Sequence, residues 1–179
     1  SYTPAAPLTD GTTVTVVARD AAGNGSAPTT RTIDLAAPAA PGLTAATDDV
    51  GSIQGAIPQG ASTNDATPTF RGTAEAGAAI AVFDGGTQIG TTTVDANGGW
   101  TFTPATPLAE GTHSLTFVAT DAAGNSSAAS APFGFTVDVT APSAPQLAPT
   151  NGTTVSGTSE PGATILLDTN GDGTADATT

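Results

Sequence analysis

Apolar side chains recur at every second position in several short segments of the chain. Ile80 and Val82 fall on one face of their segment, and so do Leu115 and Phe117. Such alternation is typical of β-strands with one buried face, and no segment sustains the period of a helix. We therefore predict strands at 42–46, 68–74, 79–84, 87–94, around Trp100 and Phe102, at 112–119 and at 133–139.

Turn signals separate these segments. Gly85-Gly86 predicts a hairpin, and DANGG (95–99) and DAAGN (121–125) predict two further turns. Roughly seven strands in about 100 residues, with turns every 8–12 residues or so, are typical of a sandwich. The pattern predicts an all-β fold.

The chain also repeats itself. ARDAAGN (18–24) matches ATDAAGN (119–125), and TIDLAAPAAP (32–41) matches TVDVTAPSAP (136–145), so that Asp34 and Asp138 stand 104 positions apart. A period near 100 residues suits a complete domain. We predict the back half of one repeat at 1–37, a whole repeat at 38–141 and the front half of another at 142–179.

Five segments of the whole repeat resemble the bacterial immunoglobulin-like domains of giant repetitive surface adhesins and biofilm-associated proteins. They are GTAEAGA (72–78), DANGGWTFTP (95–104), PLAEGTHSL (107–115), ATDAAGNSS (119–127) and FTVDVTAP (135–142). The resemblance implies tandem Greek-key immunoglobulin-like sandwiches on the bacterial cell surface. It also implies calcium at or near the domain junctions, where it makes the rod rigid.

Charge and composition narrow the function further. Sixteen acidic residues against three arginines and no lysine give a net charge of −13. This balance argues against binding to nucleic acid or anionic lipid, and the apolar runs are far shorter than the ~20 residues of a membrane span. With no cysteine, the fold depends on its core or on metal. The chain also lacks an initiator methionine, so we expect an internal piece of a longer secreted protein.

The residue content argues against an enzyme. His113 is the only histidine, and its counterpart in the first repeat is Thr13. There is no cysteine or lysine to serve as a nucleophile, and a small sandwich with short loops offers little cleft. We expect a structural extender. The rival is a calcium-dependent carbohydrate-binding module that uses Trp100, Tyr2 or the strand phenylalanines, for which the alternative is core packing.

Because antiparallel strands alternate in direction, each acidic loop can be assigned to one end of the sandwich. Asp34, Glu75, Asp121 and Asn125 (or Asn97) are predicted to converge on one junction. Asp138 and Glu160 are predicted to meet at the next. Carboxylates at a joint repel one another unless a cation lies between them, and oxygen ligands suit Ca²⁺. Each acid could instead be a turn former, as we expect of Asp95 and Asn97.

Two further calcium sites are predicted. The insert at 48–67 carries acidic or amide residues at both ends, and calcium between those ends would order it; a solvated loop is the alternative. The DTNGDGTAD segment matches the start of an EF-hand-type loop, with a plain hairpin as the alternative. The residues concerned are Asp48, Asp49, Asn64 and Asp65 in the insert, and Asp168, Asn170, Asp172 and Asp176 in the hairpin.

The partners we expect are the adjacent repeats of the same chain. The two half-repeats have unpaired strand edges, so we expect them either to stay poorly ordered or to complement each other between neighbouring chains.

Overall fold

A computed structural model describes residues 2–51, 54–150 and 152–179. The chain divides into two compact units, Ser1–Val139 and Thr140–Thr179. Within the described residues every regular element is a strand, and no helix has the length and apolar character needed to cross a membrane.

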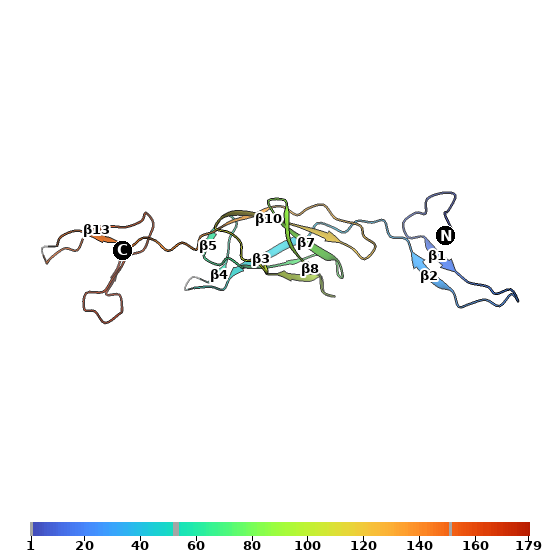
Figure 1. Ribbon diagram of the computed structural model, residues 1–179, viewed down its shortest axis with the longest axis horizontal. Coiled ribbons are helices and arrows are strands. Elements are labelled where there is room, and N and C mark those ends of the chain that lie inside the picture. The colour runs from blue at the N-terminus through green and yellow to red at the C-terminus, as the bar shows by residue number, and fades with distance from the viewer. Residues whose placement is uncertain (1, 52–53, 151) are drawn as a thin grey trace. The chain divides into compact units, whose positions relative to one another are not determined.

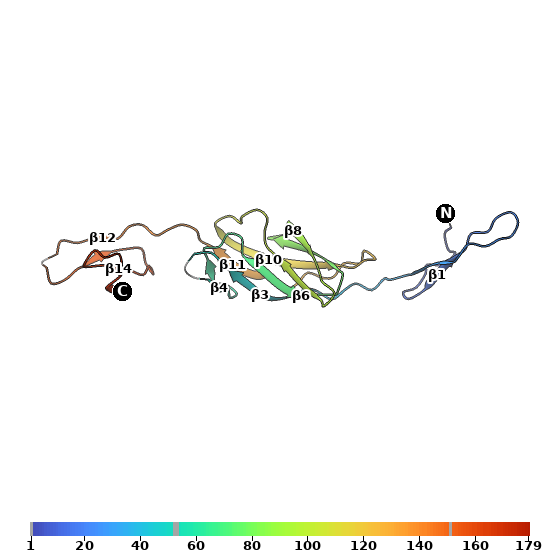
Figure 2. The ribbon, with the colours of Figure 1, turned by 90° about the horizontal axis from the view of Figure 1, so that it is seen from below.

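The larger unit contains a two-layered sandwich (Figures 1 and 2). One sheet has the order β5-β11-β10-β7-β8 and the other the order β4-β3-β6-β9. All neighbours pair antiparallel except β5 with β11, which pair parallel. The first sheet comprises β5 (Ser62–Thr63), β11 (Phe133–Val137), β10 (Gly111–Thr120), β7 (Ala79–Asp84) and β8 (Thr87–Thr93). The second comprises β4 (Gly55–Ala56), β3 (Gly42–Asp48), β6 (Thr69–Thr73) and β9 (Gly99–Phe102). The predicted all-β immunoglobulin-like sandwich is confirmed.

The core lies between the two sheets and is built from alternate strand positions. Phe70, Ile80, Val82, Leu115 and Phe117 are fully buried. The ring of Phe70 packs against that of Phe117 with centroids 6.5 Å apart. Burial of each such side chain stabilises the fold by about 1.5–3 kcal/mol, so the alternation that predicts the strands also supplies most of the stability.

The insert differs from the expected loop. Gly55–Ala56 pair with Thr47 and Asp48 and widen the second sheet. Ser62–Thr63 pair with Thr136 and Val137 and widen the first. Ile57 is buried in the core between these two strands. Strand pairing and one apolar anchor therefore order much of the insert, although Ser52 and Ile53 lie outside the described residues.

The residues before the sandwich form one hairpin, in which β1 (Thr13–Val16) pairs with β2 (Thr29–Thr32). Val16 in this hairpin is 63% exposed, and Leu35, just after it, is 60% exposed, so these apolar side chains are uncovered.

The Thr140–Thr179 unit holds two short strand pairs. β12 (Gln146–Leu147) pairs with β13 (Gly157–Thr158), and β14 (Leu166–Leu167) pairs with β15 (Ala177–Thr178). Leu147 and Leu166 are exposed, so this unit also lacks a closed core.

Candidate metal sites

The loop after β10 is shaped by its first residue, Asp121. Its Oδ1 accepts the backbone N–H of Ala123 at 2.8 Å and that of Asn125 at 2.9 Å. Its Oδ2 accepts the side-chain N–H of Asn125 at 2.8 Å. The Asn125 amide and these backbone donors outweigh burial and lower the pKa of Asp121. The carboxylate is therefore ionised and already acts as a turn former.

The same loop in the preceding repeat has the same geometry. Asp20 accepts the backbone N–H groups of Ala22 and Asn24 at 2.9 and 2.8 Å, and the Asn24 side chain at 2.8 Å. The Asn24 side chain is the main cause that lowers the pKa of Asp20. The DAAGN sequence therefore specifies one capped turn in both copies.

Asn125 connects this loop to the segment that precedes the sandwich. Its Nδ2 donates to the backbone carbonyl of Asp34 at 3.1 Å as well as to Asp121. One amide nitrogen therefore sits between a carbonyl oxygen and a carboxylate oxygen. The Asp34 carboxylate caps its own turn by accepting the N–H of Ala36 at 3.1 Å. These oxygen donors fit a hard cation such as Ca²⁺.

The contacts described for the remaining residues of the two predicted junctions do not reach Asp34, Asp121 or Asn125. Glu75 is exposed in the turn between β6 and β7, and no contact described for it reaches Asp34 or Asp121. Asp138 and Glu160 belong to different units, so their meeting stays a prediction. In the part of the chain that the structure describes, no three His, Cys, Asp or Glu side chains gather as a metal cluster.

The insert brings two of its four predicted residues close to one hydroxyl. Asp48 and Asp65 are 9% and 1% exposed, whereas Asp49 and Asn64 lie at the surface. Thr63 Oγ1 donates to Asp48 Oδ2 at 2.5 Å and accepts the backbone N–H of Asp65 at 3.1 Å. Thr63 was not among the predicted residues, because its position depends on the pairing of β5 with β11.

The predicted EF-hand-type loop is exposed and closed by its own hydrogen bonds. Asp168 accepts the backbone N–H groups of Gly171 at 2.7 Å and Gly173 at 2.9 Å, and chiefly the latter lowers its pKa. Asp176 accepts the N–H of Thr169 at 2.7 Å. Asn170 Nδ2 donates to Asp172 Oδ2 at 3.1 Å. The loop geometry is thus that of a capped hairpin, and calcium there remains a prediction.

The sequence did not point to the ion pair between His113 and Asp84. His113 Nδ1 lies 2.7 Å from Asp84 Oδ2, and Nε2 lies 2.7 Å from the carbonyl oxygen of Ala109. Burial opposes the charged ring, but the carboxylate and the carbonyl together raise the pKa of His113. This contact could have been predicted, because pairing of 79–84 with 112–119 places Asp84 beside the strand that carries His113.

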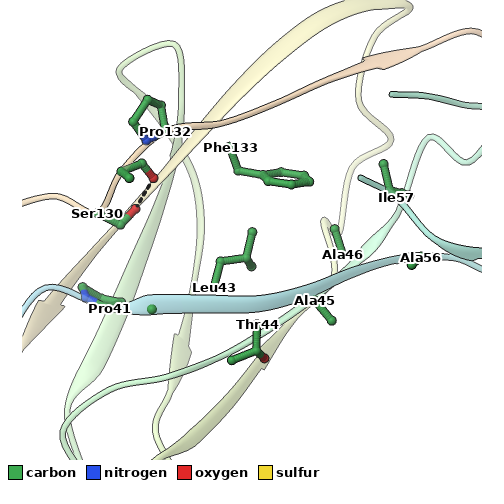
Figure 3. A pocket seen from close by; sticks show the side chains of 12 residues that line it. Pro41, Leu43, Thr44, Ala45, Ala46, Ala56, Ile57, Ser130, Pro132 and Phe133 are labelled. Atoms are coloured by element: carbon green, nitrogen blue, oxygen red, sulfur yellow. Dashed lines mark hydrogen bonds between the residues drawn. The ribbon is translucent and has the colours of Figure 1, made fainter. Parts of the chain in front are cut away.

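A groove opens at the sandwich edge beside β3 and the start of β11 (Figure 3). Leu43 and Phe133 point into it, and none of the residues that line it is titratable. The Ser130 hydroxyl is engaged, since it accepts the N–H of Phe117 at 3.1 Å and donates to the carbonyl of Ala131 at 2.9 Å. This groove offers no acid, base or free nucleophile.

Comparison with known proteins adds the family. Residues 41–139 match the model of the bacterial Ig-like domain. Among solved structures, the crystal structure of CopC from Methylosinus trichosporium OB3b is similar with a TM-score of 0.35 and 16% identity, over 55% of this chain and 93% of that one. No curated protein matches the chain. The chain belongs to the bacterial Ig-like domain family, a typically non-enzymatic family of structural or binding modules located outside the cytoplasm.

Proposed function

We propose that the chain is a run of extender repeats from the stalk of a secreted bacterial cell-surface adhesin, and that calcium at the joints between repeats stiffens this stalk. The repeated sequence, the family and the surplus of acidic residues support the proposal. Each repeat adds length, and a rigid joint keeps the far end of the protein projected from the cell.

The contact between Asn125 and Asp34 carries the proposal. A loop of the whole repeat here holds the backbone of the segment that enters it, next to the ionised carboxylate of Asp121. Asp121 and Asp34 would hold calcium through oxygen atoms, and Asn125 would join them only after its amide had turned its Oδ1 toward the ion. Calcium would supply the positive charge that offsets the neighbouring carboxylates. In a compartment with little calcium the joints would stay flexible.

Small-angle scattering of the full chain, with calcium and then with a chelator, tests the proposal. We expect calcium to increase the maximum dimension and to narrow the distribution of distances. Asp121→Asn keeps an oxygen for the loop N–H groups but removes the charge, so calcium should no longer increase the maximum dimension.

Asp95→Asn is the matched control. Asp95 caps a turn in the same way, since its Oδ1 accepts the N–H groups of Asn97 at 2.7 Å and Gly99 at 3.0 Å. Its described hydrogen bonds all lie within its own turn. This variant should keep the calcium response. Unchanged dimensions of the wild-type chain with calcium would contradict the stalk proposal.

The rival function, carbohydrate binding, gains no support from the aromatic residues of the sandwich, although Tyr2, which precedes the sandwich, is 87% exposed. Trp100 is 4% exposed and Phe102 is 7% exposed. The Trp100 ring packs on Phe117 with centroids 4.9 Å apart. These side chains form core rather than an exposed stacking platform.

A further inference from the structure

Two buried carboxylates lie at the two ends of the insert, one from each sheet of the sandwich. Asp48 is the last residue of β3 in one sheet, and Asp65 follows β5 of the other. Thr63 lies between them and bonds to the side chain of Asp48 and the backbone of Asp65. The carbonyl of Thr63 is itself fixed, because it accepts the N–H of Asp138 at 2.9 Å.

The turn after Asp48 is tight against the other end of the insert. Gly51 has a φ of +71°, and a Cβ at this position would stand 2.6 Å from Asn64 Nδ2. A side chain at residue 51 would therefore displace the Asn64 side chain. The two ends of the insert come close at two places, one of them beside both buried acids.

One oxygen of Asp65 has no hydrogen-bond partner among the described residues. Its Oδ1 accepts the N–H of Thr67 at 2.7 Å and the hydroxyl of Thr67 at 3.2 Å. Its Oδ2 is buried and has no hydrogen-bond partner within the described chain. A carboxylate oxygen held away from water without a donor costs several kcal/mol or so, and buried charges are normally paired or bound to metal.

Neither Asp48 nor Asp65 has an ion pair with a cationic side chain of the described residues. The chain has no lysine and only three arginines. Two carboxylates and a hydroxyl, with no sulfur or imidazole beside them, form a donor set for a hard divalent cation.

We propose that Asp48 and Asp65 hold a calcium ion inside the sandwich, with Thr63 beside it. The unpaired Asp65 Oδ2 would be one ligand and the Asp48 carboxylate another. Because Asp65 is 1% exposed, the ion must shed most of its water, which Mg²⁺ does reluctantly and Ca²⁺ does readily. The ion ties β3 to β5 and so replaces the disulfide that this chain cannot form.

This site is separate from the proposed joint, since it lies within one repeat and uses other residues. The test therefore uses the full chain carrying Asp121→Asn, in which the joint is disabled. Thermal unfolding is followed in chelator, in calcium and in magnesium at equal concentration. We expect calcium at a hundred times its Kd to raise Tm by about 10 °C, and magnesium to raise it far less.

Adding Asp65→Asn should abolish the rise in Tm, and Asp49→Asn, at the exposed neighbouring acid, should leave it intact. In chelator the Asp65→Asn chain should melt no lower than its parent, because an unpaired buried charge has been removed. If Asp65→Asn does not fold, Asp48→Asn is measured instead and should also lose the rise. An equal rise in the Asp65 or Asp48 variant, or an equal response to magnesium, would overturn the proposal.

Discussion

Each ring nitrogen of His113 faces a hydrogen-bond acceptor, so the protonation state of the ring affects the stability of the fold. Nε2 faces the Ala109 carbonyl and Nδ1 faces the Asp84 carboxylate. Both nitrogens can donate at once only when the ring is protonated, since the neutral ring carries a single N–H. Above the pKa of His113, two acceptors face each other in a half-buried place.

The resulting pH dependence can be measured. The pKa of His113 is raised above its ordinary value of 6.5. Its ion pair therefore stabilises the fold fully below pH 6.5, and this stabilisation is lost as the pH rises through the raised pKa. We expect the free energy of unfolding to fall by about 1 kcal/mol between about pH 6 and pH 8.

Asp84→Asn isolates this effect, since the amide oxygen can still accept the N–H of Ser114, which Asp84 Oδ1 accepts at 3.0 Å. Urea unfolding across the pH range should give a flat profile for this variant. A variant profile that falls as steeply as that of the wild type would show that another group titrates.

Gly72 stands where two backbones and an indole ring meet. A Cβ at this position would lie 2.1 Å from the carbonyl oxygen of Gly42 and 2.3 Å from Cζ2 of Trp100. Gly72→Ala must therefore move β3 or the Trp100 ring, and we expect a loss of about 1–3 kcal/mol in the free energy of unfolding. Gly134→Ala is the control, because its nearest neighbour would be Gln59 Nε2 at 3.5 Å. Equal losses in the two variants would contradict the packing argument.

At the scale of the element, the periodic strands could be predicted and the short ones could not. The segment 79–84 has the bounds of β7, and 112–119 falls within β10. In both, apolar residues alternate long enough to show a period. β4 and β5 have two residues each, so no period exists to be read. Their partners, at Thr47 and Thr136, follow from the closed sandwich rather than from the local sequence.

The candidate sites divide in the same way. The capped turns at Asp20 and Asp121 are local, and their sequence predicts the hydrogen bonds that the structure contains. The link between Asp48 and Asp65 depends on where Thr63 is placed by β11, which lies about 70 residues further along the chain. The sequence therefore shows only the acidic residues of the insert. The unpaired oxygen of Asp65 is a consequence of the tertiary structure.

At the scale of the whole molecule, the flanking half-repeats leave apolar surface uncovered. The segment VSGTSEPGA (155–163) matches FRGTAEAGA (70–78), so Val155 corresponds to Phe70. Val155 is 53% exposed, whereas Phe70 is fully buried. In the whole repeat that core position is covered by β10 and β11, since the ring of Phe70 packs on Phe117 and on Phe135. The hairpin of β1 and β2 lies in residues 1–37, which the sequence predicts to be the back half of a repeat, and it has uncovered apolar residues of its own.

We therefore expect copies of the chain to associate, with residues 1–37 of one covering residues 142–179 of the next. Sedimentation over a range of concentrations should show a mass that rises above that of the single chain.

Leu147 and Leu166 are 74% and 68% exposed. Changing both to serine removes about 3 kcal/mol of burial, which weakens association roughly a hundredfold. Val139→Ser is the control, because Val139 is 55% exposed but lies outside both half-repeats. Since the contact joins unlike ends, it can extend from chain to chain. A single-chain mass at every concentration would show that the two halves do not complete each other.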